Sequence, residues 1–131
     1  MEETKYKIIV VRGAFVDPTL LNKFNPTIIE DYEEGDEWQG LDEITVTLKD
    51  IKELQKIMIK HYSGQNNPWY MDGHKEENKN ELIVVFGADD GENGKIFQFK
   101  RTDIDEIEKV KKYGISKGIP EEQMDFGQLN V

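Results

Sequence analysis

The order of apolar and polar positions along the chain predicts a sheet built from short strands. Residues 6–11 form an apolar, β-branched run that stops at Gly13, and we expect a central strand there. Two further strands are expected at 27–32 and 44–48, the second because β-branched residues alternate along it. Residues 82–86 are apolar at every position and predict a buried strand.

The strand at 82–86 is expected to form a hairpin with a strand at 95–100. The segment between them, residues 88–94, contains Asp-Gly and Asn-Gly steps, which supply the positive φ angles of a turn. Because the first strand of this hairpin is wholly apolar, we place the hairpin near the centre of the sheet.

A short helix and a long helix are predicted in the first half of the chain. Asp17 and Pro18 form a helix start, which is followed by three inward positions, Leu20, Leu21 and Phe24. The long helix is expected over residues 49–62, where Thr47 and Asp50 resemble a capping box. Its buried face consists of Ile51, Leu54, Ile57 and Met58.

The second main helix is expected to begin at a cap formed by Thr102 and Asp105 and to end before Gly114. Its inward positions are Ile104, Ile107 and Val110. Residues 50–57 and 103–110 align at an offset of 53, and four of the eight positions are identical. Either the chain carries two related ββα units, or two capped amphipathic helices are alike because they solve the same burial problem.

Three segments show no clear period. Residues 30–43 hold eight acids and no Lys or Arg, which predicts a solvated loop. Residues 63–80 are polar and predict a long loop. Residues 115–131 form a tail whose scattered apolar side chains predict that it packs back on the domain.

Together these elements predict one α+β domain over residues 1–131. We expect a mostly antiparallel sheet of about five strands with two main helices on one face. The chain has no apolar run long enough for a membrane span, and its charged N-terminus lacks the features of a signal peptide. The cytoplasm is therefore the expected location.

The charge of the chain shapes the expectation about partners. Its 27 acidic residues outnumber its 17 basic ones, which gives a net charge of -10, and its only arginines are Arg12 and Arg101. Because nucleic-acid binding needs cations gathered on one face, direct binding to nucleic acid is not expected. A basic protein partner is the complementary expectation, beside the simpler one that the charge keeps the chain in solution. Nothing in the sequence indicates an oligomeric state.

The sequence offers little support for catalysis. With no cysteine, disulfides, zinc–thiolate sites and thiol nucleophiles are excluded. The two serines, Ser63 and Ser116, lie outside any Gly-x-Ser-x-Gly motif. The 27 acids make some carboxylate pair inevitable, so such a pair has no specificity. We expect no enzyme activity and assign no catalytic residue and no cofactor.

Two metal patterns deserve comparison with known ligand sets. Residues 89–100 partly match a calcium-binding EF-hand loop, but Gly91 and Lys100 stand where ligands are needed. His61, Asp72 and His74 imitate a set of two histidines and one carboxylate. Their spacing fits no known ligand pattern, so we expect His74 to be exposed and assign no metal site.

Aromatic and acidic residues supply the candidate binding surfaces. Trp69 and Tyr70 stand in an otherwise polar segment, where they either pin the loop onto the core or anchor a partner. The acidic stretch is the second candidate, and its proposed binding residues are Glu33, Glu34, Asp36, Glu37 and Trp38. These acids would meet a Lys/Arg-rich protein, imitate the phosphates of nucleic acid, or simply be solvated.

Three classes of function follow. The first is a non-enzymatic protein-binding or adaptor module, which the acidic and aromatic surface favours. The second is a small-molecule-binding domain or enzyme with a pocket that the sequence does not reveal. The third is an acidic mimic of nucleic acid that occupies nucleic-acid sites on other proteins.

Overall fold

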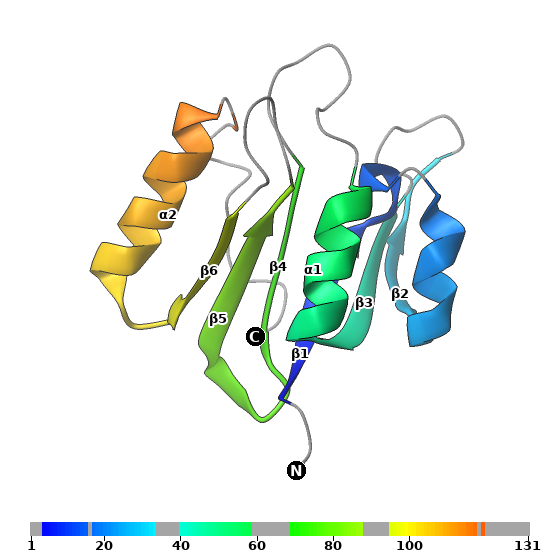
Figure 1. Ribbon diagram of the computed structural model, residues 1–131, viewed down its shortest axis with the longest axis horizontal. Helices are drawn as coiled ribbons and strands as arrows, with labels where there is room; N and C mark the ends of the chain where they lie inside the picture. Colours follow the sequence, from blue (N-terminus) through cyan, green and yellow to red (C-terminus); the bar gives the residue numbers. More distant parts are fainter. Residues whose placement is uncertain are drawn as a thin grey trace.

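The computed structural model describes residues 4–15, 17–33, 40–58, 69–87, 95–117 and 119. Within these residues, six strands form one antiparallel sheet (Figure 1). Its strand order is β2-β3-β1-β4-β5-β6. The strands are β1 (Lys5–Val11), β2 (Thr27–Asp31), β3 (Gly40–Thr47), β4 (Tyr70–Lys75), β5 (Asn78–Phe86) and β6 (Lys95–Lys100). The predicted α+β class and the central position of β1 are confirmed, and the sheet has one strand more than expected.

Two α-helices and two 3₁₀ helices accompany the sheet in the described residues. The α-helices are α1 (Leu48–Ile57), which follows β3, and α2 (Ile104–Ser116), which follows β6. The 3₁₀ helices, η1 (Arg12–Ala14) and η2 (Pro18–Phe24), lie between β1 and β2 along the chain. Figure 1 shows α1 in front of the middle strands and α2 beside β6.

The side chains of β5 show that α1 and α2 pack on opposite faces of the sheet. In the larger core cluster, two side chains of β5 pack with two of α1: Ile83, Val85, Ile51 and Leu54. In the smaller cluster, the alternate side chains of β5 pack with α2: Leu82, Val84, Phe86 and Val110. Because successive side chains of a strand point to opposite faces, one helix covers each face of β5.

This arrangement corrects two predictions. The two main helices do not share one face, and β5 is the second strand from the edge, not a central strand. The apolar run at 82–86 reflects burial on both faces of the strand, which a position near the edge also allows when helices cover both sides.

The predicted capping box of α1 is confirmed, but the helix is shorter than expected. The backbone N–H of Asp50 donates to the Thr47 hydroxyl at 3.2 Å, and the Thr47 N–H donates to the Asp50 carboxylate at 3.1 Å. The helix ends at Ile57 because Met58 turns to extended backbone and forms a β-bridge with Phe15. The remainder of the predicted helix, from residue 59, lies outside the described residues.

The short helix also forms where predicted, with a different winding. The Asp17 side chain accepts a hydrogen bond from the Thr19 N–H at 3.1 Å, and Asn25 ends the helix in the left-handed conformation. The helix is of the 3₁₀ type, which has three residues per turn. Leu21 and Phe24 therefore lie on the same side and pack in the larger core cluster. Leu20 is exposed, which corrects its predicted burial.

Helix α2 begins one residue later and ends later than predicted. Asp103 is the N-cap, and its carboxylate accepts from the Glu106 N–H at 3.2 Å. Ile104 is exposed, and Gly114 is a buried residue inside the helix instead of its end. The first residues of the predicted tail thus belong to α2, and Ile119 packs in the smaller core cluster. Residues 120–131 lie outside the described residues, so their packing stays a prediction.

The two similar helical segments have different surroundings. Asp50 is the third residue of α1, whereas the aligned Asp103 lies before α2 as its N-cap. Strand β3 lies between β2 and β1, whereas β6 is an edge strand. Together with the opposite packing of the helices, these differences favour similarity through shared burial needs over a repeated ββα unit.

Strand β4 occupies much of the segment that was predicted as a loop. Residues 70–75 pair with β5 and residues 72–75 also with β1, and the two-residue turn at 76–77 joins β4 to β5. The pattern is hard to recognise because Asp and Gly are both rare in strands. Gly73 is needed because a Cβ atom there would lie 1.9 Å from the Lys7 carbonyl oxygen of β1. Residues 63–68 of the predicted loop lie outside the described residues.

We predict that Gly73→Ala destabilises the fold by at least about 2 kcal/mol, because the backbone of β1 must move to admit the methyl group. Gly87→Ala is the matched control, since its methyl group would meet its nearest neighbours at 3.4 Å, an ordinary contact distance. Chemical denaturation of both variants measures the difference. Equal stabilities of the two variants would contradict the close approach of β1 and β4.

Candidate functional site

Trp69 lies in the core, directly before β4. It is 5% exposed and belongs to the larger core cluster, and its carbonyl oxygen accepts a hydrogen bond from the Gly87 N–H at 2.8 Å. A side chain buried to this extent has little surface to offer a partner. Of the two alternatives for Trp69, the structure therefore favours packing over docking.

The other predicted binding residues divide into three groups. Tyr70 is partly buried in β4, with its ring centroid 5.7 Å from that of Phe86. Glu33 is exposed just after β2. Four residues of the acidic stretch lie outside the described residues: Glu34, Asp36, Glu37 and Trp38. The described ranges thus do not bring Trp69, Tyr70 and Glu33 together as one surface.

His74 is buried, which corrects the prediction that it is exposed. It is 2% exposed in β4, and its Nδ1 lies 2.6 Å from the carbonyl oxygen of Lys75. Asp72 stands two positions earlier on the same strand, while His61 and the calcium-like turn at 88–94 lie outside the described residues. Within the residues that the structure describes, no three ligating side chains gather as a metal site.

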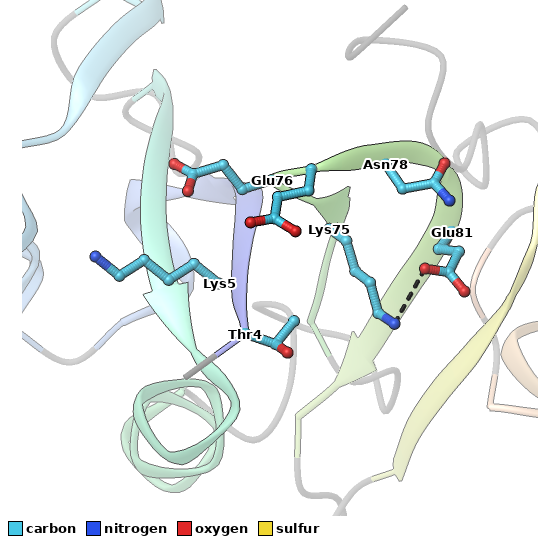
Figure 2. A pocket seen from close by; sticks show the side chains of 7 residues that line it. Thr4, Lys5, Lys75, Glu76, Asn78 and Glu81 are labelled. Carbon is cyan, nitrogen blue, oxygen red and sulfur yellow. Dashed lines mark ion pairs between the residues drawn. The ribbon is translucent and has the colours of Figure 1, made fainter. Parts of the chain in front are cut away.

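An open groove of about 580 Å³ lies at the β4–β5 turn (Figure 2). Its main interaction is the ion pair of Lys75 and Glu81, whose charged atoms are 3.0 Å apart and which raises the pKa of Lys75. Figure 2 shows the Lys75 ammonium pointing to Glu81, while Lys5 points away from this pair. Because these lining groups pair with each other or point apart, they do not converge on one ligand position.

A different polar cluster lies where β1 ends. The Arg12 Nε is 3.1 Å from a carboxylate oxygen of Asp42 in β3. Its Nη2 donates to the Glu30 carbonyl oxygen of β2 at 3.1 Å and pairs with the Asp31 carboxylate. One guanidinium, on η1 directly after β1, thus links β2 and β3. We name this set of Arg12, Glu30, Asp31 and Asp42 the Arg12 clamp.

Asp42 is the buried member of the clamp. It is 4% exposed, and its Oδ1 has no hydrogen-bond partner among the described residues. Burial raises the pKa of Asp42 above its usual value of 3.8, and the charge of Asp31 adds to the rise, while Arg12 opposes it. The folded chain therefore favours the protonated form of Asp42 relative to the unfolded chain.

The sequence contains a signal for this buried acid that the prediction missed. In the segment at 40–47, Asp42 is in phase with Ile44 and Val46, which are both buried. Side chains two positions apart in a strand share a face, so the alternation places Asp42 on the core side. A buried acid needs a cation, and Arg12 is one of only two arginines in the chain.

Strand β2 forms one edge of the sheet, and all five of its residues are exposed. Ile28 is 60% exposed, and Ile29 beside it is also exposed. A β-bulge interrupts the pairing with β3 between Ile28 and Glu30. No described strand pairs with the outer side of β2, so this edge presents backbone donors and acceptors next to two isoleucines and the acids that follow.

We predict that Trp69→Ala lowers the free energy of unfolding by about 3–5 kcal/mol, because a large buried side chain leaves a cavity. Thermal or chemical denaturation measures the loss. A variant with unchanged stability would contradict the packing role of Trp69.

We predict that the free energy of unfolding of Asp42→Asn at neutral pH equals that of the wild type or is higher by up to about 1 kcal/mol. The amide has no charge to desolvate, and Arg12 remains paired with Asp31. An acid with a raised pKa stabilises the fold less as the pH rises through that pKa. The difference between variant and wild type should therefore shrink as the pH is lowered towards 3.8. Denaturation at several pH values tests this, and a clear loss of stability at neutral pH would show that attraction to Arg12 outweighs desolvation.

Comparisons with known proteins do not add a function to this geometry. No family model, no curated protein and no solved structure matches the chain. In the described part of the chain, neither α1 nor α2 has the length and apolar content that crossing a bilayer requires. The case for a function therefore depends on the chain's own residues, above all on the exposed edge of β2.

Proposed function

We propose that the chain is a non-enzymatic protein-binding module whose strand β2 pairs with an extended, Lys/Arg-rich segment of a partner protein. The observation that supports this proposal is the exposure of the whole edge strand, including Ile28 and Ile29, beside acidic residues. Strand addition at a sheet edge is a common mode of peptide recognition, in which backbone hydrogen bonds give affinity and side chains give specificity.

The chemistry of β2 fits a partner strand that alternates apolar and basic residues. Ile28 and Ile29 offer apolar contact, whereas Glu30 and Asp31 follow directly on the same strand and are exposed. Glu33 extends the acidic surface beyond the strand. Because Asp31 is paired with Arg12, the attraction for a basic segment comes chiefly from Glu30, Glu33 and the net charge of -10, which also speeds its approach.

The same charges argue against a second copy of the chain as the occupant. A second copy carries the same net charge of -10, and pairing registers centred on Glu30 or Asp31 would place like charges opposite each other, which opposes the pairing. The bulge after Ile28 further disfavours a regular edge-to-edge contact. A basic partner removes the repulsion that would arise between two copies.

Strand β6, the other edge of the sheet, fits a basic partner less well. It begins with Lys95 and ends with Lys100, both exposed, so a basic segment would meet like charges there. Phe99 on this strand is buried and has little surface for contact. The proposal therefore assigns the partner to β2, and the cytoplasm, where a chain without cysteines needs no disulfides, is its proposed location.

We predict that a synthetic peptide of alternating Val and Lys shifts the backbone amide signals of residues 27–31 in NMR spectra of the full chain. Ile28→Lys should weaken this binding by about tenfold, because it removes an apolar contact and adds a repelling charge. Ile115→Lys is the matched control, since Ile115 is 48% exposed against 60% for Ile28 and lies on α2. The control should bind as the wild type does.

A second peptide of alternating Val and Glu tests the charge requirement. It should not bind, and the binding of the Lys peptide should weaken as the salt concentration rises. Equal binding of both peptides, or shifts confined to β6, would contradict the proposed function. If β2 shows no response while nucleic acid displaces a basic protein from the chain, the acidic mimic becomes the favoured function.

A further inference from the structure

We propose that Arg12 is the positioning residue of the β2 edge, and that its guanidinium, which reaches β2 past Gly40, keeps that strand ordered for docking. This inference deepens the proposed function and depends on it for the role in docking. The ordering of β2 by Arg12 is a property of the chain without any partner, so it is tested separately.

Strand β2 has little else to hold it in place. None of its five residues is buried, so it contributes no side chain to either core cluster. Its pairing with β3 is interrupted by the bulge after Ile28. Segments with few buried apolar contacts open at a low free-energy cost, and β2 belongs to this class on its strand pairing alone.

The Arg12 clamp supplies an interaction of a different kind. The guanidinium donates to the Glu30 carbonyl oxygen and pairs with the Asp31 carboxylate, so it holds both the backbone and a side chain of β2. Its Nε faces Asp42 in β3, where burial of the carboxylate fixes the other end of the link. The two contacts of Nη2 are charge-assisted hydrogen bonds, which are about twice as strong as neutral ones. The contact of Nε with Asp42 is an ion pair without a hydrogen bond.

Gly40 shows that the backbone is shaped around this guanidinium. A Cβ atom on Gly40 would lie 2.2 Å from Nη2 of Arg12 and 2.5 Å from the Glu30 carbonyl oxygen. Its φ of 156° also favours glycine. Gly40 pairs with Asp31 at the beginning of β3, so no side chain stands where the Arg12 guanidinium approaches Glu30.

Amide hydrogen exchange of the full chain, without peptide, tests the ordering role. We predict that Arg12→Gln raises the exchange rates of residues 27–31 by about tenfold or more, because the charge-assisted links to β2 are lost. The rates in β5 should stay within about twofold of wild type. Arg12→Lys should resemble Arg12→Gln, since a single ammonium cannot contact Glu30, Asp31 and Asp42 together as the guanidinium does.

Arg101→Gln is the matched control. Arg101 is the only other arginine of the chain, and its guanidinium also donates to a backbone carbonyl oxygen, that of Lys79, at 2.8 Å. Its loss should leave the exchange rates of β2 unchanged. Asp31→Asn is a second test that does not threaten folding, because the Asp31 side chain is 61% exposed, and it should raise exchange in β2 less than Arg12→Gln does.

The outcomes separate the two proposals. Equal increases in β2, β4 and β5 would show that Arg12 acts on the whole fold, and unchanged rates in β2 would show that the clamp does not order the strand; either result overturns the inference. If the increase is confined to β2, Arg12→Gln should also weaken binding of the Val/Lys peptide by about tenfold. A third outcome is that Arg12→Gln raises exchange only in β2 while the wild-type chain does not bind the peptide. This outcome would support the clamp and contradict the docking function.

Discussion

The fold depends on the burial of one strand from both sides. In β5, the five apolar residues at 82–86 are almost fully buried, and alternate side chains enter two separate core clusters. A strand of this kind needs a covering layer on each face, and α1 and α2 provide one each. At the opposite edge of the sheet, β2 has no buried residue. The uneven covering leaves β2 as an exposed edge.

The exposed edge explains why a polar cluster stands at that end of the sheet. Where apolar packing is absent, an edge strand must be held by hydrogen bonds and charges, and Arg12 supplies both to Glu30 and Asp31. The link requires a carboxylate in the core, which is unfavourable by itself, as the raised pKa of Asp42 shows. A buried ion pair often adds little net stability, and the role we propose for this one is to fix which groups lie together. Its consequence here is the place of β2.

The sequence predicts most of the fold because burial leaves a periodic signal. The capping box at Thr47 and Asp50 and the strand at 82–86 were recognised from local pattern and confirmed. Strand β4 was missed because Gly73 is required by the close approach of β1, a contact between distant segments that no local pattern records. The prediction that both helices pack on one face of the sheet was wrong, because a wholly apolar strand does not indicate which helix covers which face.

The candidate site was also hard to predict, because it depends on contacts between distant segments of the chain. Arg12, Asp31 and Asp42 belong to three different elements, and only the strand order brings them together. The acids of β2 have two effects that cannot be separated: they discourage pairing between copies of the chain, and they set the sign of any partner that can pair. The proposed partner of this edge is therefore a basic strand. The proposed docking also needs β2 to be ordered, and the hydrogen bond from Arg12 to the Glu30 carbonyl oxygen is the contact to which we assign that role.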